Sequence, residues 1–387
     1  MTAGSDVLVI GGGLQGLSSA LHLARRGCSV RLLEADYCGR HASGVNAGGV
    51  RTVDRHFAEV PLSVAARALW HAMPELVDQD VGFVPSGQLK LAETPEELEV
   101  LRQRVQALQA MGFFHEQLIA PAEVRELVPA LTPRIAGAIW AKDDGYAYPY
   151  AVVMAFRRAG ERRGVQVHEA TPVQRIERRG NRWQVHAPGG PFEARHLVNT
   201  AGAWAGEIAR QAGEPVPLEA GGLMLMVTPR IAHFINPVLG ATGRALSFKQ
   251  FANGTVVIGG GLRCTADAVA GHGEVDMLKL ATSAQTVTDL FPHLGPIAIN
   301  RAWAGVEGFM PDQIPVIGPS RTQPGLVHAF GFSAHGFELS PIVGQIVAEL
   351  VLDGCSTLPI APFAVDRFER PGGESALSSF PPVNQRP

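Results

Sequence analysis

The fold is decided by residues 10–17, which read IGGGLQGL and directly follow the apolar run DVLVI of residues 6–10. Gly11, Gly13 and Gly16 fit the pattern G-x-G-x-x-G. Glycines at these places allow a tight turn and a close approach of the backbone to a pyrophosphate. A helix that begins here also offers its N–H groups to the phosphates. The stretch therefore predicts a loop that binds a nucleotide cofactor.

The residues after the glycines complete a strand–helix–strand unit. Residues 14–27 have apolar side chains at helical spacing and end at Gly27, and CSVRLLEA, residues 28–35, predicts a second strand. Glu34 at the end of that strand is suited to accept both hydroxyls of an adenosine ribose. The alternative is a glycine-rich turn without a ligand, and the strand, helix and acidic residue together argue against it.

NAD and FAD share this pattern, so the loop alone does not choose between them. Its place at the extreme N-terminus and the lack of a proper second copy favour FAD. The nearest second copy is VIGGGLRC, residues 257–264, but Cys264 stands where a third glycine is needed. The preceding Asn253-Gly254 predicts an antiparallel hairpin. We therefore interpret residues 257–264 as the end of a strand in a substrate domain and expect no NAD(P)H.

Composition limits the class of protein. The chain has 387 residues and a formal net charge of −3, which suits two globular domains and disfavours a nucleic-acid partner. Its four cysteines lie far apart without metal-binding spacing and predict free thiols in a reducing compartment. We find neither a secretion signal nor an apolar stretch of about 18 residues. We therefore expect a cytoplasmic protein with no membrane span and no metal.

Further elements follow from local patterns. Thr94 and Glu97 predict the capped start of an amphipathic helix over residues 94–111. Other helices are expected over residues 150–163 and 274–291, and a long one follows the glycine-rich turn after residue 330. The strand-rich regions are residues 165–199 and 221–261.

Several segments together resemble one known family. They are, in chain order, ASGVNAGGVR (42–51), DDGYAYP (143–149), LVNTAGAWA (197–205), WAGVEGFMPDQIPVIG (303–318) and GFSAHGFELSP (331–341). With the N-terminal unit, they resemble the D-amino-acid oxidase-like FAD-dependent oxidoreductases, which include sarcosine and glycine oxidases. The resemblance spans almost the whole chain. HASGVNAGGVR is most similar to the FAD-bearing β subunits of D-hydroxyproline dehydrogenases and opine oxidases.

The resemblance implies an α/β fold in two domains. One is a Rossmann-like FAD-binding domain of the glutathione-reductase type, and the other is an α+β substrate domain with a mixed antiparallel sheet. The FAD-binding domain is expected to be discontinuous, over residues 1–85, 143–217 and 300–370. The substrate domain is expected over residues 86–142 and 218–299, and residues 371–387 as a flexible tail.

The resemblance also implies which residues surround FAD. Small residues over 43–49 would let the flat flavin ring approach the backbone, and the start of the helix after His335 would stabilise negative charge on the reduced ring. The expected cofactor-binding residues are Gly11, Gly13, Leu14, Gln15, Gly16, Glu34, Ala35, Ser43, Asn46, Ala47, Gly48, Gly49, Val173, Thr200, Ala201, Gly202, Trp204, Gly305, Gly331, Ser333, His335, Gly336, Phe337 and Glu338. Asn46 stands near where some relatives carry a flavin-linked histidine, so we expect non-covalent FAD.

The expected reaction passes a hydride from the substrate α-carbon to flavin N5. Arg51 is the candidate for holding the substrate carboxylate, with a surface or phosphate-side arginine as the alternative. Glu307 stands where glycine-oxidase-like relatives carry an arginine, and it either holds a substrate ammonium or guanidinium or points away. His335 is a candidate catalytic residue, although a structural histidine in a tight turn is the plainer interpretation.

Aromatic residues and a missing cation complete the predicted site. Tyr146, Tyr148 and Phe248 are candidates for the walls of the substrate pocket, or else core residues. Sarcosine oxidases place a lysine over the flavin, and Val257 occupies the matching position here. Without that cation, the negative charge that develops on oxygen would be poorly stabilised. This difference favours a dehydrogenase that passes electrons to a partner.

The leading hypothesis is therefore FAD-dependent oxidation of the C–N bond of a secondary or D-amino acid to an imine. Hydroxyproline, an opine or a sarcosine-like amine are the candidate substrates, and the chain would be the catalytic β subunit of a dehydrogenase complex with partner subunits or an electron-acceptor protein. One alternative is a stand-alone sarcosine- or glycine-type oxidase that produces hydrogen peroxide. Another is a non-catalytic flavin-binding subunit, and an NAD dehydrogenase is more distant.

Overall fold

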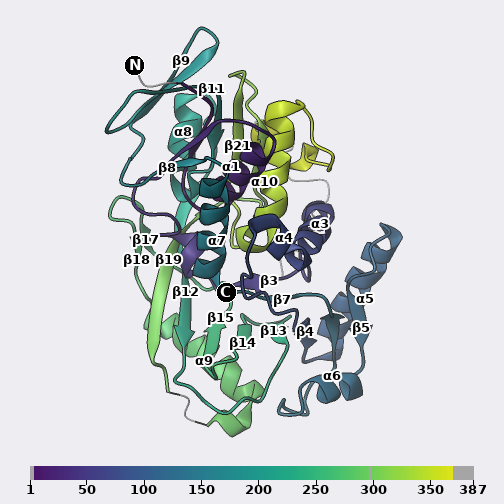
Figure 1. The fold of residues 1–387 in the computed structure, drawn as a ribbon. Coiled ribbons are helices and arrows are strands. Elements are labelled where there is room, and N and C mark those ends of the chain that lie inside the picture. Colours follow the sequence, from purple (N-terminus) through teal and green to yellow (C-terminus); the bar gives the residue numbers. More distant parts are fainter. Residues whose placement is uncertain (1–3, 296–297, 369–387) are drawn as a thin grey trace.

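The structure is a computed structural model that describes residues 4–295 and 298–368, and it is built on two large sheets (Figure 1). The first sheet has the order β20-β21-β11-β1-β2-β8, with β10 and β9 added beside β11. Its strands are β1 (Ser5–Ile10), β2 (Val30–Leu33), β8 (Gln166–His168), β9 (Arg175–Arg179), β10 (Arg182–His186), β11 (Phe192–Asn199), β20 (Val316–Pro319) and β21 (Leu326–Phe330). The neighbours β8, β2, β1, β11 and β21 run parallel, as expected for a nucleotide-binding domain.

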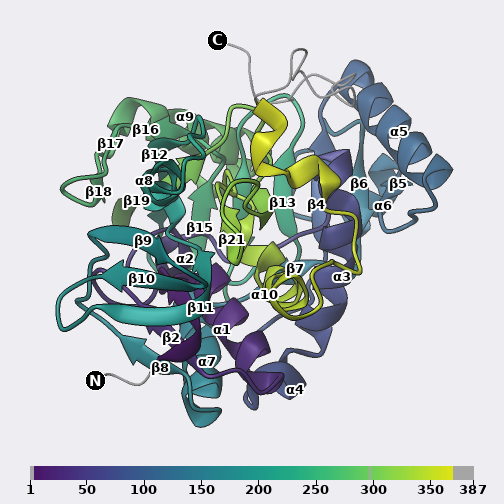
Figure 2. The same ribbon diagram turned by 90° about the horizontal axis from the view of Figure 1, so that it is seen from above.

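Helices cover the faces of this sheet. They are α1 (Leu14–Arg25), α3 (Val60–His71), α4 (Met73–Val77), α7 (Pro149–Arg162), α8 (Ala205–Gln211) and α10 (Gly336–Leu352). Helix α10 packs closely on α1 and α3 (Figure 2). A side chain at Gly344 would overlap Ser18 of α1, so glycine allows this close crossing.

The second sheet has the order β16-β12-β15-β14-β13-β4-β6-β5, with β19 paired to β12. Its strands are β4 (Gln88–Ala92), β5 (Gln117–Ile119), β6 (Gly137–Ala141), β12 (Glu219–Val227), β13 (Val238–Ala241), β14 (Ser247–Gln250), β15 (Val256–Gly259), β16 (Arg263–Cys264) and β19 (Arg301–Phe309). One face packs against α6 (Pro121–Leu127) and α9 (Met277–Leu290) in an apolar core. The opposite face looks toward the nucleotide-binding domain. Helix α5 (Pro95–Ala110) packs at the outer edge, beside β4, β5 and β6 (Figure 2).

Short elements join the two sheets. They are α2 (Ala42–Val45), β3 (Gly49–Val50), β7 (Gly145–Tyr146), which pairs with β3, and the small hairpin β17 (Ala266–Asp267) and β18 (His272–Gly273). Because α2 and β3 lie next to each other in sequence, the residues between them are held at the junction of the two domains.

The local predictions can be compared with these elements. The helix after Thr94 is confirmed, and the Thr94 hydroxyl accepts the N–H of Glu97 at 3.2 Å. The Asn253-Gly254 hairpin is also confirmed, because it joins the antiparallel strands β14 and β15. One domain boundary needs correction. The division at residue 300 placed β19 in the FAD-binding domain, but its long pairing with β12 makes it part of the second sheet.

Three further expectations concern the tail, a membrane span and a metal site. The expected tail over residues 371–387 lies outside the described residues. Among the described helices, none combines the length and the apolar character that a bilayer crossing requires. No group of three or more His, Cys, Asp or Glu side chains in the described part of the chain is arranged to hold a metal ion.

Candidate active site

The glycine loop has the close contacts that the sequence pattern predicts. A side chain at Gly16 would overlap the carbonyl oxygen of Gly11, so only glycine lets α1 begin this close to β1. The carboxylate of Glu34 accepts the N–H of Gly12 at 2.6 Å. Burial raises the pKa of Glu34, although backbone N–H groups oppose this effect. Glu34 is thus held beside the loop, at the edge where an adenosine ribose would lie.

A continuous cavity of about 1610 Å³ runs from this loop to the second sheet. It is lined by all of the expected cofactor-binding residues except Gly16 and Glu338, namely Gly11, Gly13, Leu14, Gln15, Glu34, Ala35, Ser43, Asn46, Ala47, Gly48, Gly49, Val173, Thr200, Ala201, Gly202, Trp204, Gly305, Gly331, Ser333, His335, Gly336 and Phe337. The cavity is larger than most sites for one small molecule. It therefore has room for a dinucleotide and a substrate together.

The lining of the cavity fits a dinucleotide cofactor. The Oε1 atom of Gln15 is buried without a hydrogen-bond partner, although Nε2 of the same side chain donates to the carbonyl of Gly336. Ser43 accepts the N–H of Leu14 at 2.9 Å and brings the 42–49 loop against the start of α1. Asn46 fixes that loop from within, because its Nδ2 donates to Ala42 and Ser43 and its Oδ1 accepts from Gly48. These contacts hold small residues and backbone groups where the phosphates and ring of a flavin need close approach.

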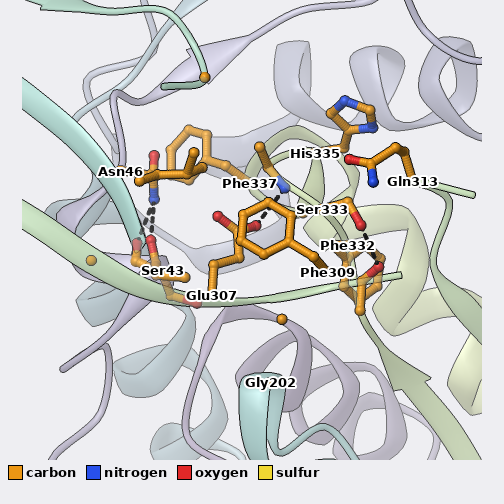
Figure 3. Close-up of a pocket in the computed structure, with 18 of the residues that line it drawn as sticks. Ser43, Asn46, Gly202, Glu307, Phe309, Gln313, Phe332, Ser333, His335 and Phe337 are labelled. Carbon is orange, nitrogen blue, oxygen red and sulfur yellow. Dashed lines mark hydrogen bonds between the residues drawn. The ribbon is translucent and has the colours of Figure 1, made fainter. Parts of the chain in front are cut away.

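Glu307 points toward the turn that precedes α10 (Figure 3). Its Oε1 accepts the N–H of Ala334 at 2.6 Å. Ser333 and Ala334 both have positive φ angles, 49° and 74°, a strained turn that directs this N–H into the cavity. Burial raises the pKa of Glu307 to about 7, with Ala334 and Arg263 opposing the rise. The alternative in which Glu307 points away from the cavity is therefore wrong.

Arg51 lies inside the molecule and lines the same cavity, so it is not a surface arginine. Its Nη1 donates to the carbonyl of Val53 at 2.7 Å. Asp54 lies beside it and pairs with Lys90 at 2.6 Å. Arg104, which also lines the cavity, pairs with buried Glu116 at 2.7 Å. Burial opposes ionisation of Asp54, but Lys90, Arg104 and Arg51 together hold its pKa below the usual range.

Lys90 and Arg104 of this cluster are each paired with a carboxylate, Asp54 and Glu116 respectively. The charges of Arg55, Asp54, Glu59 and Glu338 also act on Arg51. Arg51 is the cation without a carboxylate partner among the ion pairs of the described residues, and burial lowers its pKa to about 10. A buried cation without a directly paired carboxylate is stabilised when an anion joins it. A substrate carboxylate would supply that anion.

His335 faces the cavity and is held from behind by Glu59. Its Nδ1 lies 3.1 Å from Oε2 of Glu59, which is fully buried. Burial lowers the pKa of His335, although Glu59 opposes the change. Glu338, in contrast, does not line the cavity. It forms a buried ion pair with Arg55 at 3.0 Å and so stabilises the start of α10 on the side away from the cavity.

None of the three predicted wall residues lines the cavity. Phe248 is fully buried on the other face of the second sheet, stacked on Phe291. Successive residues of a strand point to opposite faces, so its neighbours Ser247 and Lys249 face the nucleotide-binding domain instead. Tyr146 is buried against Phe251 at a centroid distance of 5.0 Å, and Tyr148 stacks on the same ring. These aromatic rings form the apolar layer behind the cavity.

Lys249 is a residue that the sequence comparison missed. It lies directly opposite Val257 in the antiparallel pair of β14 and β15. Directly opposed residues share a face of the sheet, with their Cβ atoms about 5 Å apart. Its ammonium group is buried and donates to the carbonyl of Ala47 in the 42–49 loop. Burial lowers the pKa of Lys249 to about 7. The neighbouring strand therefore supplies a buried ammonium on the same face as Val257, beside the 42–49 loop.

The fold and this cavity agree with comparisons against known proteins. Residues 6–350 match the model of the DAO family, described as FAD dependent oxidoreductase. The chain belongs to this family. Its fold is the α/β fold of the DAO family, with an FAD domain and a substrate domain on a mixed sheet, and it is an oxidoreductase that depends on FAD.

Individual members of the DAO family are similar over nearly their whole length. Glycine oxidase of Geobacillus kaustophilus is 28% identical, over 95% of this chain and 98% of the relative. One of the opine oxidase subunits of Rhizobium meliloti is 27% identical, over 94% of this chain and 98% of the relative. Among solved structures, L-proline dehydrogenase from P. horikoshii superposes with a TM-score of 0.88 at 29% identity and covers 96% of this chain and 99% of that one.

Proposed function

We propose that this protein oxidises the C–N bond of a secondary or D-amino acid to an imine. The observation that carries the proposal is the buried guanidinium of Arg51, which lines the cavity and has no carboxylate partner among the ion pairs of the described residues. An α-carboxylate is the anion that such a site holds best, through charge-assisted hydrogen bonds. The activities for which the similar proteins are named, on glycine, opines and L-proline, support the same substrate class.

The residues of this chain have separate tasks in the proposed reaction. Bound FAD supplies the acceptor for the hydride that leaves the substrate carbon. Arg51 orients the substrate through its carboxylate, so that the carbon to be oxidised has one position. Glu307, once ionised, attracts the substrate nitrogen. Small residues of the 42–49 loop and the buried aromatic layer around Tyr146 keep water away from the ring.

We further propose that FAD is held without a covalent bond. Asn46, near the place of a flavin-linked histidine in some relatives, offers only an amide, and that amide is engaged by Ala42, Ser43 and Gly48. Each of the four cysteines lies within the described residues, and none lines the cavity.

The chain is proposed to act as the catalytic subunit of a dehydrogenase complex, which would contain an electron-accepting partner. The similarity to a protein that is one subunit of an opine oxidase supports this role. An anaerobic panel of amino acids, opines and N-methyl amino acids tests the chemistry, with the flavin absorbance near 450 nm as the readout. Bleaching by at least one amino acid is expected for the isolated chain. No bleaching by any of them would instead favour a non-catalytic flavin-binding subunit.

Lys249 favours a second candidate, a stand-alone oxidase that produces hydrogen peroxide. A buried ammonium near the ring stabilises the negative charge that develops when electrons reach oxygen. The two candidates differ in one measurement. Reduced enzyme mixed with air-saturated buffer releases stoichiometric peroxide at the rate of turnover if the chain is an oxidase. Slow reoxidation, with fast turnover only when an artificial acceptor is added, supports the dehydrogenase.

A further inference from the structure

The proposed reaction gives no task to Gln88, a polar residue of the cavity lining. Gln88 and Lys90 are two residues apart on β4, so their side chains lie on the same face, the one that looks toward the nucleotide-binding domain. Both line the cavity, whereas Leu89 and Leu91 between them enter the apolar core. Lys90 is paired with Asp54. The Oε1 atom of Gln88 has no hydrogen-bond partner, although the residue is only 5% exposed.

The strand next to β4 leaves space beside Lys90, one pleat along from this amide. In the parallel pair of β13 and β4, Val238 lies beside Gln88 and Gly240 lies beside Lys90. Gly240 has no side chain to fill the cavity, and Ser247 of β14 lines it on the same face. We call Gln88, Gly240 and Ser247 the polar floor. It is a small recess on the substrate sheet, next to the charge cluster around Arg51.

The polar floor lies at a defined distance from the charge cluster. Residues two apart on a strand are separated by roughly 7 Å, so Gln88 stands about that far along β4 from Lys90. A substrate whose carboxylate meets Arg51 near Lys90 would direct the rest of its skeleton along this face. A polar group on the substrate side chain, remote from the carbon to be oxidised, would then reach Gln88.

We propose that Gln88 selects substrates that carry a hydroxyl group on the side chain or ring. This inference rests on the proposed amino-acid oxidation and adds a specificity residue to it. A hydroxyl both donates and accepts, so it pairs with the amide whichever way the amide is turned. A carboxylate would leave Oε1 unpaired, and an ammonium would lie beside the charge of Lys90. A hydroxyl therefore satisfies the polar floor best.

The strength of such selection follows from the buried amide. A site built to hydrogen-bond a substrate hydroxyl rejects the analogue that lacks it, because the buried group of the protein is then left unpaired. A single bound water could satisfy Gln88 when the analogue binds, and it would reduce the discrimination. We expect a preference of about 10-fold or more in kcat/KM for the hydroxylated member of a matched pair.

The test compares matched substrates on the holoenzyme. Proline and 4-hydroxyproline, each as both enantiomers, and alanine and serine, each as both enantiomers, form pairs that differ by one hydroxyl. Flavin reduction is followed anaerobically for the wild type, Gln88→Leu and the control Gln109→Leu, whose side chain is exposed on α5. We expect Gln88→Leu to lose the preference by lowering kcat/KM for the hydroxylated member only. Gln109→Leu should keep it.

The outcomes separate this inference from the proposed function. Equal rates for both members of every pair in the wild type, or a preference that survives in Gln88→Leu, overturn the role of Gln88 and leave the proposed reaction standing. Flavin that no amino acid reduces overturns both. If Gln88→Leu does not fold, Gln88→Asn gives the same test, because it keeps the amide but withdraws it by one methylene. Its preference should then fall, and an unchanged preference counts against the inference.

Discussion

The carboxylate of Glu59 lies 3.1 Å from Nδ1 of His335, and no part of Glu59 reaches the surface. The contact joins the start of α3 to the start of α10, and it leaves Nε2 as the free nitrogen of the ring. A carboxylate that accepts from Nδ1–H fixes the tautomer in which Nε2 is an acceptor. Burial opposes ionisation of Glu59, yet His335 and Arg55 hold its pKa below the usual range. His335 is thus presented to the cavity as a neutral base in a fixed orientation.

Glu59→Gln should lower kcat for amino-acid oxidation by about 10-fold or more, since an amide permits either tautomer. The pH dependence of kcat should also shift, which a purely structural contact would not cause. Steady-state rates from about pH 5.5 to about pH 9.5 measure both, with Glu75→Gln on the exposed face of α4 as the control. An unchanged kcat and pH profile would mean that the Glu59 contact only supports the turn around His335.

Glu307→Gln should remove a pH-dependent change in the stability of the folded protein. The pKa of Glu307 is raised to about 7, so the folded protein binds a proton that the unfolded chain has already released above its usual pKa of 4.5. The contribution of Glu307 to stability is therefore largest at acid pH and falls as pH rises through 7. The melting temperature should be measured at about pH 5 and about pH 8. Relative to the wild type, that of Glu307→Gln should be a few degrees higher at about pH 8 than at about pH 5.

The same carboxylate predicts the pH dependence of substrate binding. Ionised Glu307 attracts an ammonium, so KM should fall in the wild type as pH rises through about 7 and stay flat in Glu307→Gln. Glu219→Gln, an exposed residue on the neighbouring strand β12, is the control and should behave as the wild type. A flat wild-type profile contradicts the role of Glu307 in holding the substrate nitrogen.

The nucleotide-binding unit was predictable because its determinants are local. The contact between Gly16 and Gly11 arises within one short loop, and the capping of α5 by Thr94 arises within a single helical turn. Side-chain chemistry and spacing decide such structures without knowledge of the rest of the fold. Most residues expected around the cofactor share the cavity for the same reason, since short motifs carry them.

The substrate side could not be predicted in the same way. Phe248 and Lys249 are neighbours in sequence, and which of them faces the cavity depends on the register of β14 between β13 and β15. A shift of one residue would exchange their faces. Lys249 also lies opposite Val257 on another strand, so alignment position by position does not reveal that it supplies the cation. The ion pair of Lys90 with Asp54 likewise joins two segments whose separation in space is set by the tertiary fold.

Gly16→Ala should abolish flavin binding. The added methyl group would overlap the carbonyl of Gly11, and the backbone cannot move without displacing the start of α1. Gly318→Ala in β20 is the matched control, because a side chain there meets nothing within 4 Å. The ratio of the visible flavin absorbance to the protein absorbance after purification measures flavin content. Equal flavin content in both variants would show that the loop tolerates a wider turn than its contacts indicate.

Acid precipitation tests the proposed non-covalent attachment. Trichloroacetic acid should release all of the flavin into the supernatant, because the amide of Asn46 forms no bond to the ring and the cysteines lie away from the cavity. The pellet should be colourless, and denaturing gels of the protein should show no fluorescence. A yellow pellet would contradict the proposal and direct attention to His41, which lines the cavity and packs against Trp204 with tilted rings at a centroid distance of 4.6 Å.

Lys249→Met should slow the reaction of the reduced enzyme with oxygen. The pKa of Lys249 is lowered to about 7 by burial, so its ammonium is charged below neutrality and loses its charge above. The charged form stabilises the negative charge that develops on oxygen. Reoxidation in the wild type should therefore be fastest below about pH 7 and fall as pH rises, whereas Lys249→Met should be slow and independent of pH.

Lys142→Met, at an exposed position, is the control for stopped-flow measurements of the flavin absorbance. Equal reoxidation rates in Lys249→Met and the wild type would remove the support that this lysine gives to an oxidase, and electron transfer to a partner protein would then be the stronger proposal.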